Sequence, residues 1–137
     1  MIVLDASVWI SGIRPDETHY EVSRRWLAQR RGEGAPIAVP VHFLAEVAGA
    51  FSRPVDGSEA EGLDALQTVL DERLIERFEL DDELAEAAAR TAARCRIRAG
   101  DALYVALARE LDVPLITWDD QLLDRARVLV DVRVPTA

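Results

Sequence analysis

The chain has 137 residues, half of them hydrophobic, and its 25 acidic and 16 basic side chains give a formal net charge of −9 at pH 7. This length and composition suit one folded domain over residues 1–137 rather than a disordered chain. No apolar run approaches the roughly 20 residues that a membrane span needs, and the first residues include no basic side chain of the kind that begins a signal peptide. We therefore expect a cytoplasmic protein with no membrane partner.

Apolar periodicity and turn residues divide the chain into short strands and helices. In chain order we predict a strand over 2–5, a helix over 17–31, a strand over 37–39, helices over 41–52 and 58–73, a strand over 75–80, helices over 81–96 and 101–111, a strand over 115–118, a helix over 119–127 and a strand over 128–134. Strands that alternate with helices indicate an α/β fold with a mostly parallel sheet. Such sheets bind ligands outside the carboxyl ends of their strands.

Four carboxylates stand alone in apolar sequence near those predicted strand ends and helix starts. They are Asp5, Glu46, Asp101 and Asp119. Isolated acids in apolar segments are expected to be partly buried, and a buried carboxylate without a partner is costly. The chain contains no lysine to neutralise them. If the four converge, a hard divalent cation such as Mg²⁺ or Mn²⁺ suits the resulting all-oxygen site.

Each of these acids also has a purely structural interpretation. Asp5, Asp101 and Asp119 could cap a turn or a helix, and Glu46 could reach solvent along the side of its helix. Asp120 competes with Asp119 as the residue after the predicted strand over 115–118. The metal interpretation is favoured because all four acids fall at equivalent ends of one predicted sheet.

The quartet and its flanking residues resemble the PIN domain, in the compact form of the VapC toxins. The resemblance covers the whole chain and rests on an opening hydrophobic-hydrophobic-Asp-Ala-Ser, on Glu46, on Asp101-Ala-Leu-Tyr-Val-Ala and on Thr117-Trp-Asp119. It implies a three-layer α/β/α sandwich around a four- to five-stranded sheet. It also implies a Mg²⁺- or Mn²⁺-dependent endoribonuclease that uses the acidic quartet as catalytic and metal-binding residues, with Ser7 and Thr117 as supporting hydroxyls.

The same resemblance implies several partners. The substrate would be an RNA (tRNA, rRNA or mRNA), cleaved to leave 5′-phosphate and 3′-hydroxyl ends. A VapB-like antitoxin would cover the site by inserting a basic residue among the acids, and the toxin would be a homodimer. The alternative is a catalytically silent PIN-like module that acts by binding alone.

The arginines are the only cations that could contact RNA phosphates. Arg90, Arg94 and Arg98 are spaced four residues apart and predict a cationic ridge if one helix carries all three. A second cluster lies over residues 24–31. Either group could instead be a solvated face or a partner surface. Residues 56–86 hold twelve acids against two arginines, which predicts a solvated face far from the site.

Other functional classes and residues fit the sequence less well. A phosphate-receiver domain requires a lysine, a haloacid-dehalogenase-type phosphatase requires a second aspartate where Ser7 stands, and no nucleotide-binding P-loop is present. His19 and His42 are the only histidines, and we do not expect either to be a catalytic acid or base. Trp9 and Trp26 are expected in the core or at an interface, and Cys95 is expected to be a small buried or half-buried residue.

Overall fold

The computed structural model describes residues 1–136 and contains one five-stranded sheet. Its strands are β1 (Ile2–Leu4), β2 (Ile37–Pro40), β3 (Ile75–Phe78), β4 (Leu115–Ile116) and β5 (Val132–Arg133), in the order β3-β2-β1-β4-β5. Every neighbouring pair is parallel. The predicted α/β fold around a parallel sheet is therefore confirmed.

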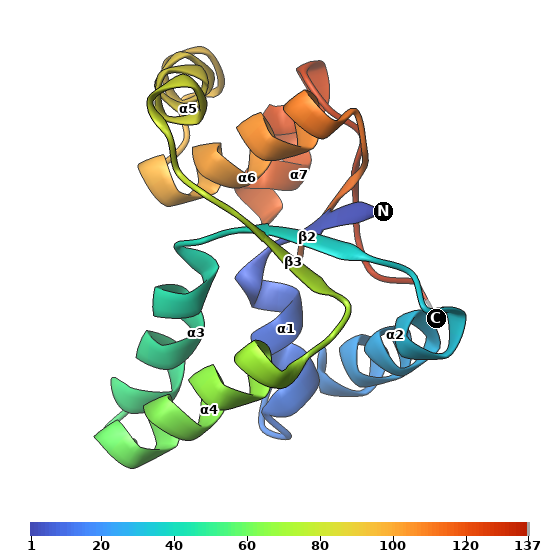
Figure 1. Ribbon diagram of the computed structural model, residues 1–137, viewed down its shortest axis with the longest axis vertical. Helices are drawn as coiled ribbons and strands as arrows, with labels where there is room; N and C mark the ends of the chain where they lie inside the picture. The colour runs from blue at the N-terminus through green and yellow to red at the C-terminus, as the bar shows by residue number, and fades with distance from the viewer. Residues whose placement is uncertain (137) are drawn as a thin grey trace.

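The central strands are apolar along their whole length because helices cover both faces of the sheet. All residues of β1 and β2 are buried, which is typical of parallel sheets enclosed on both sides. The helices are α1 (Ala6–Ile13), α2 (Tyr20–Glu33), α3 (Phe43–Ser52), α4 (Glu59–Asp71), α5 (Asp82–Cys95), α6 (Ala99–Leu111) and α7 (Asp120–Arg125). Helices α1 to α4 lie on one side of the sheet and α5, α6 and α7 on the other, as Figure 1 shows.

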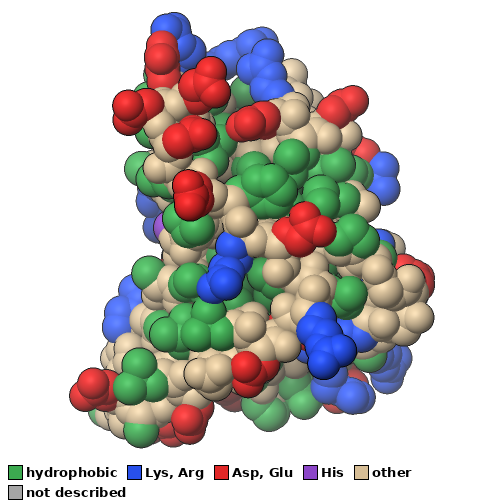
Figure 2. Space-filling view, in the orientation of Figure 1, with side chains coloured by type: hydrophobic (Ala, Val, Ile, Leu, Met, Phe, Trp, Pro, Cys, Tyr) green, Lys and Arg blue, Asp and Glu red, His purple; other side chains and the backbone are tan. Residues whose placement is uncertain are grey.

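The core is formed where α1 and α6 meet opposite faces of the sheet. Trp9 of α1 and Tyr104 of α6 are among the largest side chains with almost no exposure. Trp26 and Cys95 are also buried, as the sequence predicts. On the surface, acidic and arginine side chains are interspersed with hydrophobic ones in the view of Figure 2. None of the helices described in residues 1–136 has the length and apolar character to span a bilayer.

Three local predictions are wrong. Residues 6–13 were given no element but form α1, a short helix without a side-chain cap that follows directly on β1. The last strand begins at Val132 rather than at 128, because a 3₁₀ turn over Ala126–Val128 continues α7. The arginine ridge does not exist as one helix face, because α5 ends at Cys95, and Arg98 lies at the N-cap of α6.

Candidate active site

The four isolated acids line one groove at the carboxyl end of the sheet. This groove has a volume of about 730 Å³, and its walls include all four carboxylates together with Ser7, His42, Arg53 and Arg98. Strand β1 lies at the centre of the sheet, with β2 on one side and β4 on the other. The chain builds the sheet from β1 to β2 and β3 on one side and then crosses to β4 on the other side of β1. Open parallel sheets bind ligands at such a reversal of strand order.

Strand ends and first helical turns position the carboxylates. Asp5 follows β1 and occupies the N-cap position of α1, and Asp119 follows β4 and caps α7. Glu46 and Asp101 lie in the first turns of α3 and α6. The positive ends of these helix dipoles therefore favour negative charge around the groove.

Asp5 is the most deeply buried of the four acids. Its residue is 5% exposed, and its Oδ2 accepts hydrogen bonds from Ser7 Oγ at 2.7 Å and from Thr117 Oγ1 at 2.6 Å. Burial raises the pKa of Asp5 to about 6; the two hydroxyl bonds lower it, while the charges of Glu46 and Asp101 raise it further. The carboxyl group nearest the sheet thus has its protonation change near neutral pH when no cation is present.

The two hydroxyl groups that hold Asp5 also fix the loop that carries Asp119. Thr117 Oγ1 accepts a hydrogen bond from the backbone N–H of Asp119 at 2.9 Å. Ser7 Oγ accepts one from the backbone N–H of Trp118 at 3.1 Å. The structure therefore places both predicted hydroxyl residues against the quartet, where they join the end of β1 to the end of β4.

Glu46 is held from one side by Tyr104 and His42, which contact the same carboxylate oxygen. Tyr104 Oη donates to Glu46 Oε1 at 2.8 Å, and His42 Nε2 contacts the same oxygen at 2.8 Å. Burial acts to raise the pKa of Glu46, but the hydrogen bonds from His42 and Tyr104 outweigh it and lower the pKa. Burial and the charge of Glu46 raise the pKa of Tyr104 well above its usual value, so this phenol stays a donor.

Arg98 is the cation beside the remaining two acids. Its Nε lies 3.4 Å from Asp101 Oδ2 and its Nη2 lies 3.9 Å from Asp119 Oδ2, while its side chain is 79% exposed. An ion pair this exposed contributes little stability. Burial and the neighbouring charge of Asp119 raise the pKa of Asp101 despite Arg98. The acids are thus only partly neutralised by the chain itself.

Three of the four carboxylates have one oxygen bound by fixed donors and another left for a ligand. The bound oxygens are Asp5 Oδ2, Glu46 Oε1 and Asp119 Oδ1, which accepts from the backbone N–H groups of Gln121 at 2.8 Å and Leu122 at 3.1 Å. Asp119 therefore also caps α7, as its structural interpretation predicts. Its other oxygen, Oδ2, lies on the side of Arg98.

This donor set fits a hard cation that keeps part of its water shell. Within residues 1–136, no three acidic, histidine or cysteine side chains are close enough together to form a ready metal cage. Mg²⁺ is usually held by one or two carboxylates and several waters, so it does not need such a cage. The free oxygens around one groove match that requirement better than they match a cation that demands many protein ligands.

The structure separates the predicted site residues into two groups. The quartet, Ser7, Thr117 and Arg98 come together at the groove or directly beneath it. The exposed Asp120 begins α7 and does not line the groove. Arg90 and Arg94 lie on α5 outside it, and Arg90 pairs with Glu86 at 2.7 Å.

Sequence reasoning missed His42, Tyr104 and Arg53 as groove residues or groove supports. Two of them carried a usable signal, because Tyr104 lies three residues after Asp101 and His42 lies four residues before Glu46. Residues at those spacings share a helix face or meet at a helix start. Arg53, which donates to the Gly49 carbonyl at 3.0 Å, carried none.

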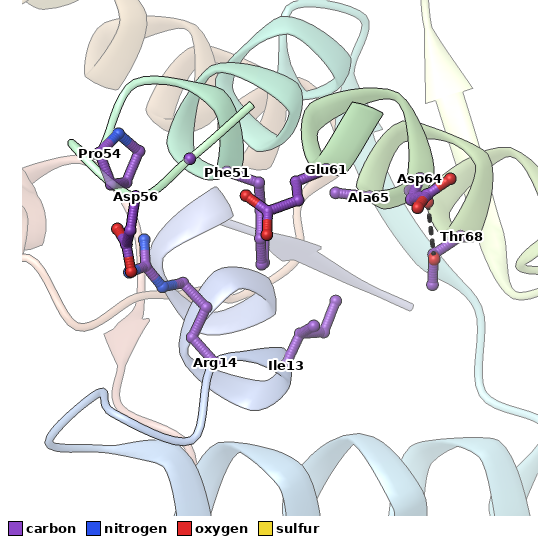
Figure 3. A pocket seen from close by; sticks show the side chains of 10 residues that line it. Ile13, Arg14, Phe51, Pro54, Asp56, Glu61, Asp64, Ala65 and Thr68 are labelled. Carbon is purple, nitrogen blue, oxygen red and sulfur yellow. Dashed lines mark hydrogen bonds between the residues drawn. The ribbon is translucent and has the colours of Figure 1, made fainter. Parts of the chain in front are cut away.

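A second cavity lies at the opposite ends of α1 and α3, where they meet α4. It has a volume of about 330 Å³, with Ile13, Phe51 and Ala65 among its apolar lining residues. Figure 3 shows acidic side chains from α4 and from the loop before it around this cavity. Arg14 crosses one side and donates to the Ala50 carbonyl at 3.1 Å. The cavity is apolar inside and mainly acidic outside.

Comparisons with known proteins agree with this geometry. A family model described as PIN domain matches residues 2–128. The solved structure of VapC20 from Mycobacterium tuberculosis, described as a sarcin-ricin loop cleaving toxin, is similar with a TM-score of 0.75 and 16% identity over 90% of this chain and 94% of that one. Among curated proteins, no sequence matches significantly.

Two solved complexes are also similar in fold. A DNA-bound VapBC from Salmonella typhimurium has a TM-score of 0.73 and 12% identity over 99% of this chain and 100% of that one. A toxin–antitoxin complex from Klebsiella pneumoniae has a TM-score of 0.65 and 18% identity over 99% of this chain and 98% of that one. Identities this low show a shared fold.

Proposed function

Because the chain belongs to the PIN domain family, we propose that it is a metal-dependent endoribonuclease and the toxin of a VapBC-type pair, acting in the cytoplasm. The observation that carries this proposal is the groove in which Asp5, Glu46, Asp101 and Asp119 meet. Similar folds occur in a toxin described as cleaving the sarcin-ricin loop and in toxin–antitoxin complexes.

The chain's own residues would divide the work of phosphodiester hydrolysis. Asp5, Asp101 and Asp119 would hold Mg²⁺ or Mn²⁺ through the oxygens that protein donors leave free. When bound, the ion would activate water and neutralise charge on the phosphate. Glu46 would hold the ion directly or orient the attacking water through Oε2. Arg98, at the edge of the groove, would bind a phosphate of the RNA.

A VapB-like antitoxin would compete for the same carboxylates with an inserted basic residue. The cavity beside α4 supports a longer contact with that partner, because its apolar lining and acidic edge suit an apolar side chain flanked by basic ones. We also propose that the toxin forms a homodimer.

The decisive experiment is cleavage of a mixed tRNA and rRNA substrate by the purified chain. Reactions would contain Mg²⁺, Mn²⁺ or EDTA, and would compare the wild type with Asp5→Asn and Asp101→Asn. Asp120→Asn is the matched control, because Asp120 is an exposed acid next to Asp119 that does not line the groove. We expect metal-dependent cleavage that Asp5→Asn and Asp101→Asn reduce at least 100-fold and that Asp120→Asn leaves unchanged.

Two results would contradict the proposal. Cleavage that survives in EDTA or in both groove variants would assign the activity to something other than the quartet. A folded, partner-free wild type that binds RNA but cleaves none of it in any lane would favour the silent binding module. Binding of Mn²⁺ by the wild type, measured separately, shows whether the groove holds metal in either case.

A further inference from the structure

Glu46 depends on other side chains for its position more than the three aspartates do. Its side chain is the longest of the four, it is 38% exposed, and it caps no helix. Both of its hydrogen bonds fall on Oε1, from Tyr104 and from His42. Within residues 1–136, Oε2 has no hydrogen-bond partner. A flexible carboxylate is thus fixed through one oxygen at the wall of the groove.

Tyr104 is placed to act on the site rather than only to fill the core. It lies three residues after Asp101 on α6, so one helix carries both an acid of the quartet and the donor to Glu46. Its side chain is fully buried, where a hydroxyl without a partner would cost free energy. The carboxylate of Glu46, on α3, supplies that partner.

His42 joins α3 to the backbone at the start of α6. Its Nε2 lies 2.8 Å from Glu46 Oε1 and 3.0 Å from the carbonyl oxygen of Gly100, the residue before Asp101. Both neighbours are acceptors, so the ring carries a hydrogen on Nε2. Nδ1 is buried and has no partner in the described part of the chain, so the polar contacts of the ring in this part of the chain are made through Nε2. The ring also packs against Tyr104 at 4.8 Å between centroids.

We propose that His42 and Tyr104 are positioning residues that together hold Glu46 Oε1, so that Glu46 presents only Oε2 to a metal ion or water in the groove. His42 additionally keeps the Gly100–Asp101 backbone at a set distance from Glu46. This inference rests on the proposed metal-dependent nuclease function and extends it to two residues outside the acidic quartet. Neither residue touches the reacting atoms.

The competing explanation is that the pair only stabilises the fold where the start of α3 meets the start of α6. The two explanations differ in what a shape-conserving substitution does. Gln places an amide nitrogen near the position of His Nε2, so His42→Gln keeps the donor, whereas His42→Leu keeps bulk without it. Tyr104→Phe removes a single hydroxyl and little volume. If packing alone matters, Leu and Phe are tolerated and Gln offers no advantage.

The test measures Mn²⁺ binding by the RNA-free protein, using calorimetry or electron paramagnetic resonance. Loss of a group that orients a metal ligand costs about 10- to 100-fold in affinity or activity. We expect His42→Leu and Tyr104→Phe each to weaken Mn²⁺ binding about tenfold, and His42→Gln to stay within about threefold of wild type. In cleavage assays kcat should fall with the KM for RNA unchanged. Circular dichroism establishes that each variant is folded.

A metal-independent readout separates failure of this inference from failure of the proposed function. In the ¹⁵N spectrum of the metal-free protein, His42 should carry its hydrogen on Nε2, and Glu46→Gln should shift that signal. Suppose that His42→Leu and Tyr104→Phe bind Mn²⁺ as tightly as the wild type, whereas Asp5→Asn binds it much more weakly. That result would overturn the role of His42 and Tyr104 and leave the proposed function standing. If the wild type binds no Mn²⁺ and cleaves nothing, the proposed function fails, and the ¹⁵N shift decides whether Glu46 is held as proposed.

Discussion

Thr117 donates a hydrogen bond of 2.6 Å to Asp5, a residue 112 positions earlier in the chain. Both residues are buried, with Thr117 at 0% exposure. The bond crosses from the end of β4 to the end of β1, and the same hydroxyl accepts the backbone N–H of Asp119. One side chain thus sets the distance between two acids of the quartet, which makes it a sensitive point for both stability and activity.

Replacing Thr117 with Val keeps the shape of the side chain and removes both bonds. A buried group that loses its partner costs about 1–3 kcal/mol, so we expect the free energy of unfolding to fall by that amount. Cleavage should fall about 10- to 100-fold because Asp5 and Asp119 are no longer tied together. Thr117→Ser should recover most of both. Urea denaturation and cleavage rates measure the two effects, and a fully active Thr117→Val would contradict this role.

Asp5 should make the metal-free fold less stable above pH 6. Its pKa is raised from 3.8 to about 6 by burial, so its contribution to stability is complete below about pH 3.8 and is lost as the pH rises through about 6. The difference between the two pKa values of Asp5 corresponds to about 3 kcal/mol in the free energy of unfolding. Asp5→Asn cannot ionise, so it should be more stable than wild type at pH 8, by up to that amount, while it loses cleavage.

Urea denaturation in EDTA at pH 4, 6 and 8 measures this effect. The stability gap between Asp5→Asn and wild type should be near zero at pH 4 and should be complete by pH 8. Adding Mg²⁺ should reduce the gap, because the cation stabilises only the ionised wild type. Asp120→Asn, which changes an exposed acid outside the groove, serves as the control. A gap that is equal at all three pH values would mean that Asp5 does not titrate as described.

The acidic quartet could be predicted from sequence because three of its members stand alone in apolar segments and Asp119 ends another. Isolation of that kind reports burial, and the parallel-sheet rule then places the strand ends together. Helical spacing alone could bring His42 near Glu46 and Tyr104 near Asp101, but it could not predict the contacts of His42 with Gly100 and of Tyr104 with Glu46. Their contacts join α3 to α6 across 58 residues, and no local pattern contains that distance.

The elements that sequence reasoning placed wrongly fail for local reasons. Residues 6–13 combine β-branched, aromatic and small side chains, so periodicity does not identify α1, although Asp5 occupies its N-cap position. The arginine spacing suggested one helix through Arg98, but Arg96 adopts a left-handed conformation with φ of 57° and ends α5. A non-glycine residue in that conformation is uncommon and has no clear sequence signal.

The cavity beside α4 should contribute to antitoxin binding. Glu61 and Asp64 are exposed acids at its edge, so replacing both with Arg reverses the local charge without disturbing the core. We expect this double variant to bind a cognate VapB-like antitoxin at least tenfold more weakly, with RNA cleavage unchanged. The matched control is Glu83→Arg with Glu86→Arg on α5, away from the cavity. Equal affinity for the two double variants and wild type would remove the cavity from the partner surface.

Arg98 should affect metal and RNA binding in opposite directions. It lies beside Asp101 and Asp119 with most of its side chain exposed, so it both opposes a cation in the groove and offers a guanidinium to phosphate. Arg98→Gln should bind Mn²⁺ about two- to threefold more tightly, a small change because exposed pairs are screened. It should also bind RNA several-fold more weakly in EDTA, which prevents metal-dependent cleavage during the measurement.

The same measurement on Arg90→Gln and Arg94→Gln decides whether the RNA path extends over α5. A plot of the logarithm of RNA affinity against the logarithm of salt concentration has a slope that reflects the number of phosphate contacts. Each phosphate contact that is lost should reduce this slope by about one. If only Arg98→Gln lowers that slope, the RNA stays at the groove, because Arg90 and Arg94 lie outside it. If all three lower it, the α5 arginines extend the RNA surface as the sequence predicts, although they do not share a helix with Arg98. If none does, Arg98 serves the carboxylates alone and the RNA reaches them from the side of Arg53.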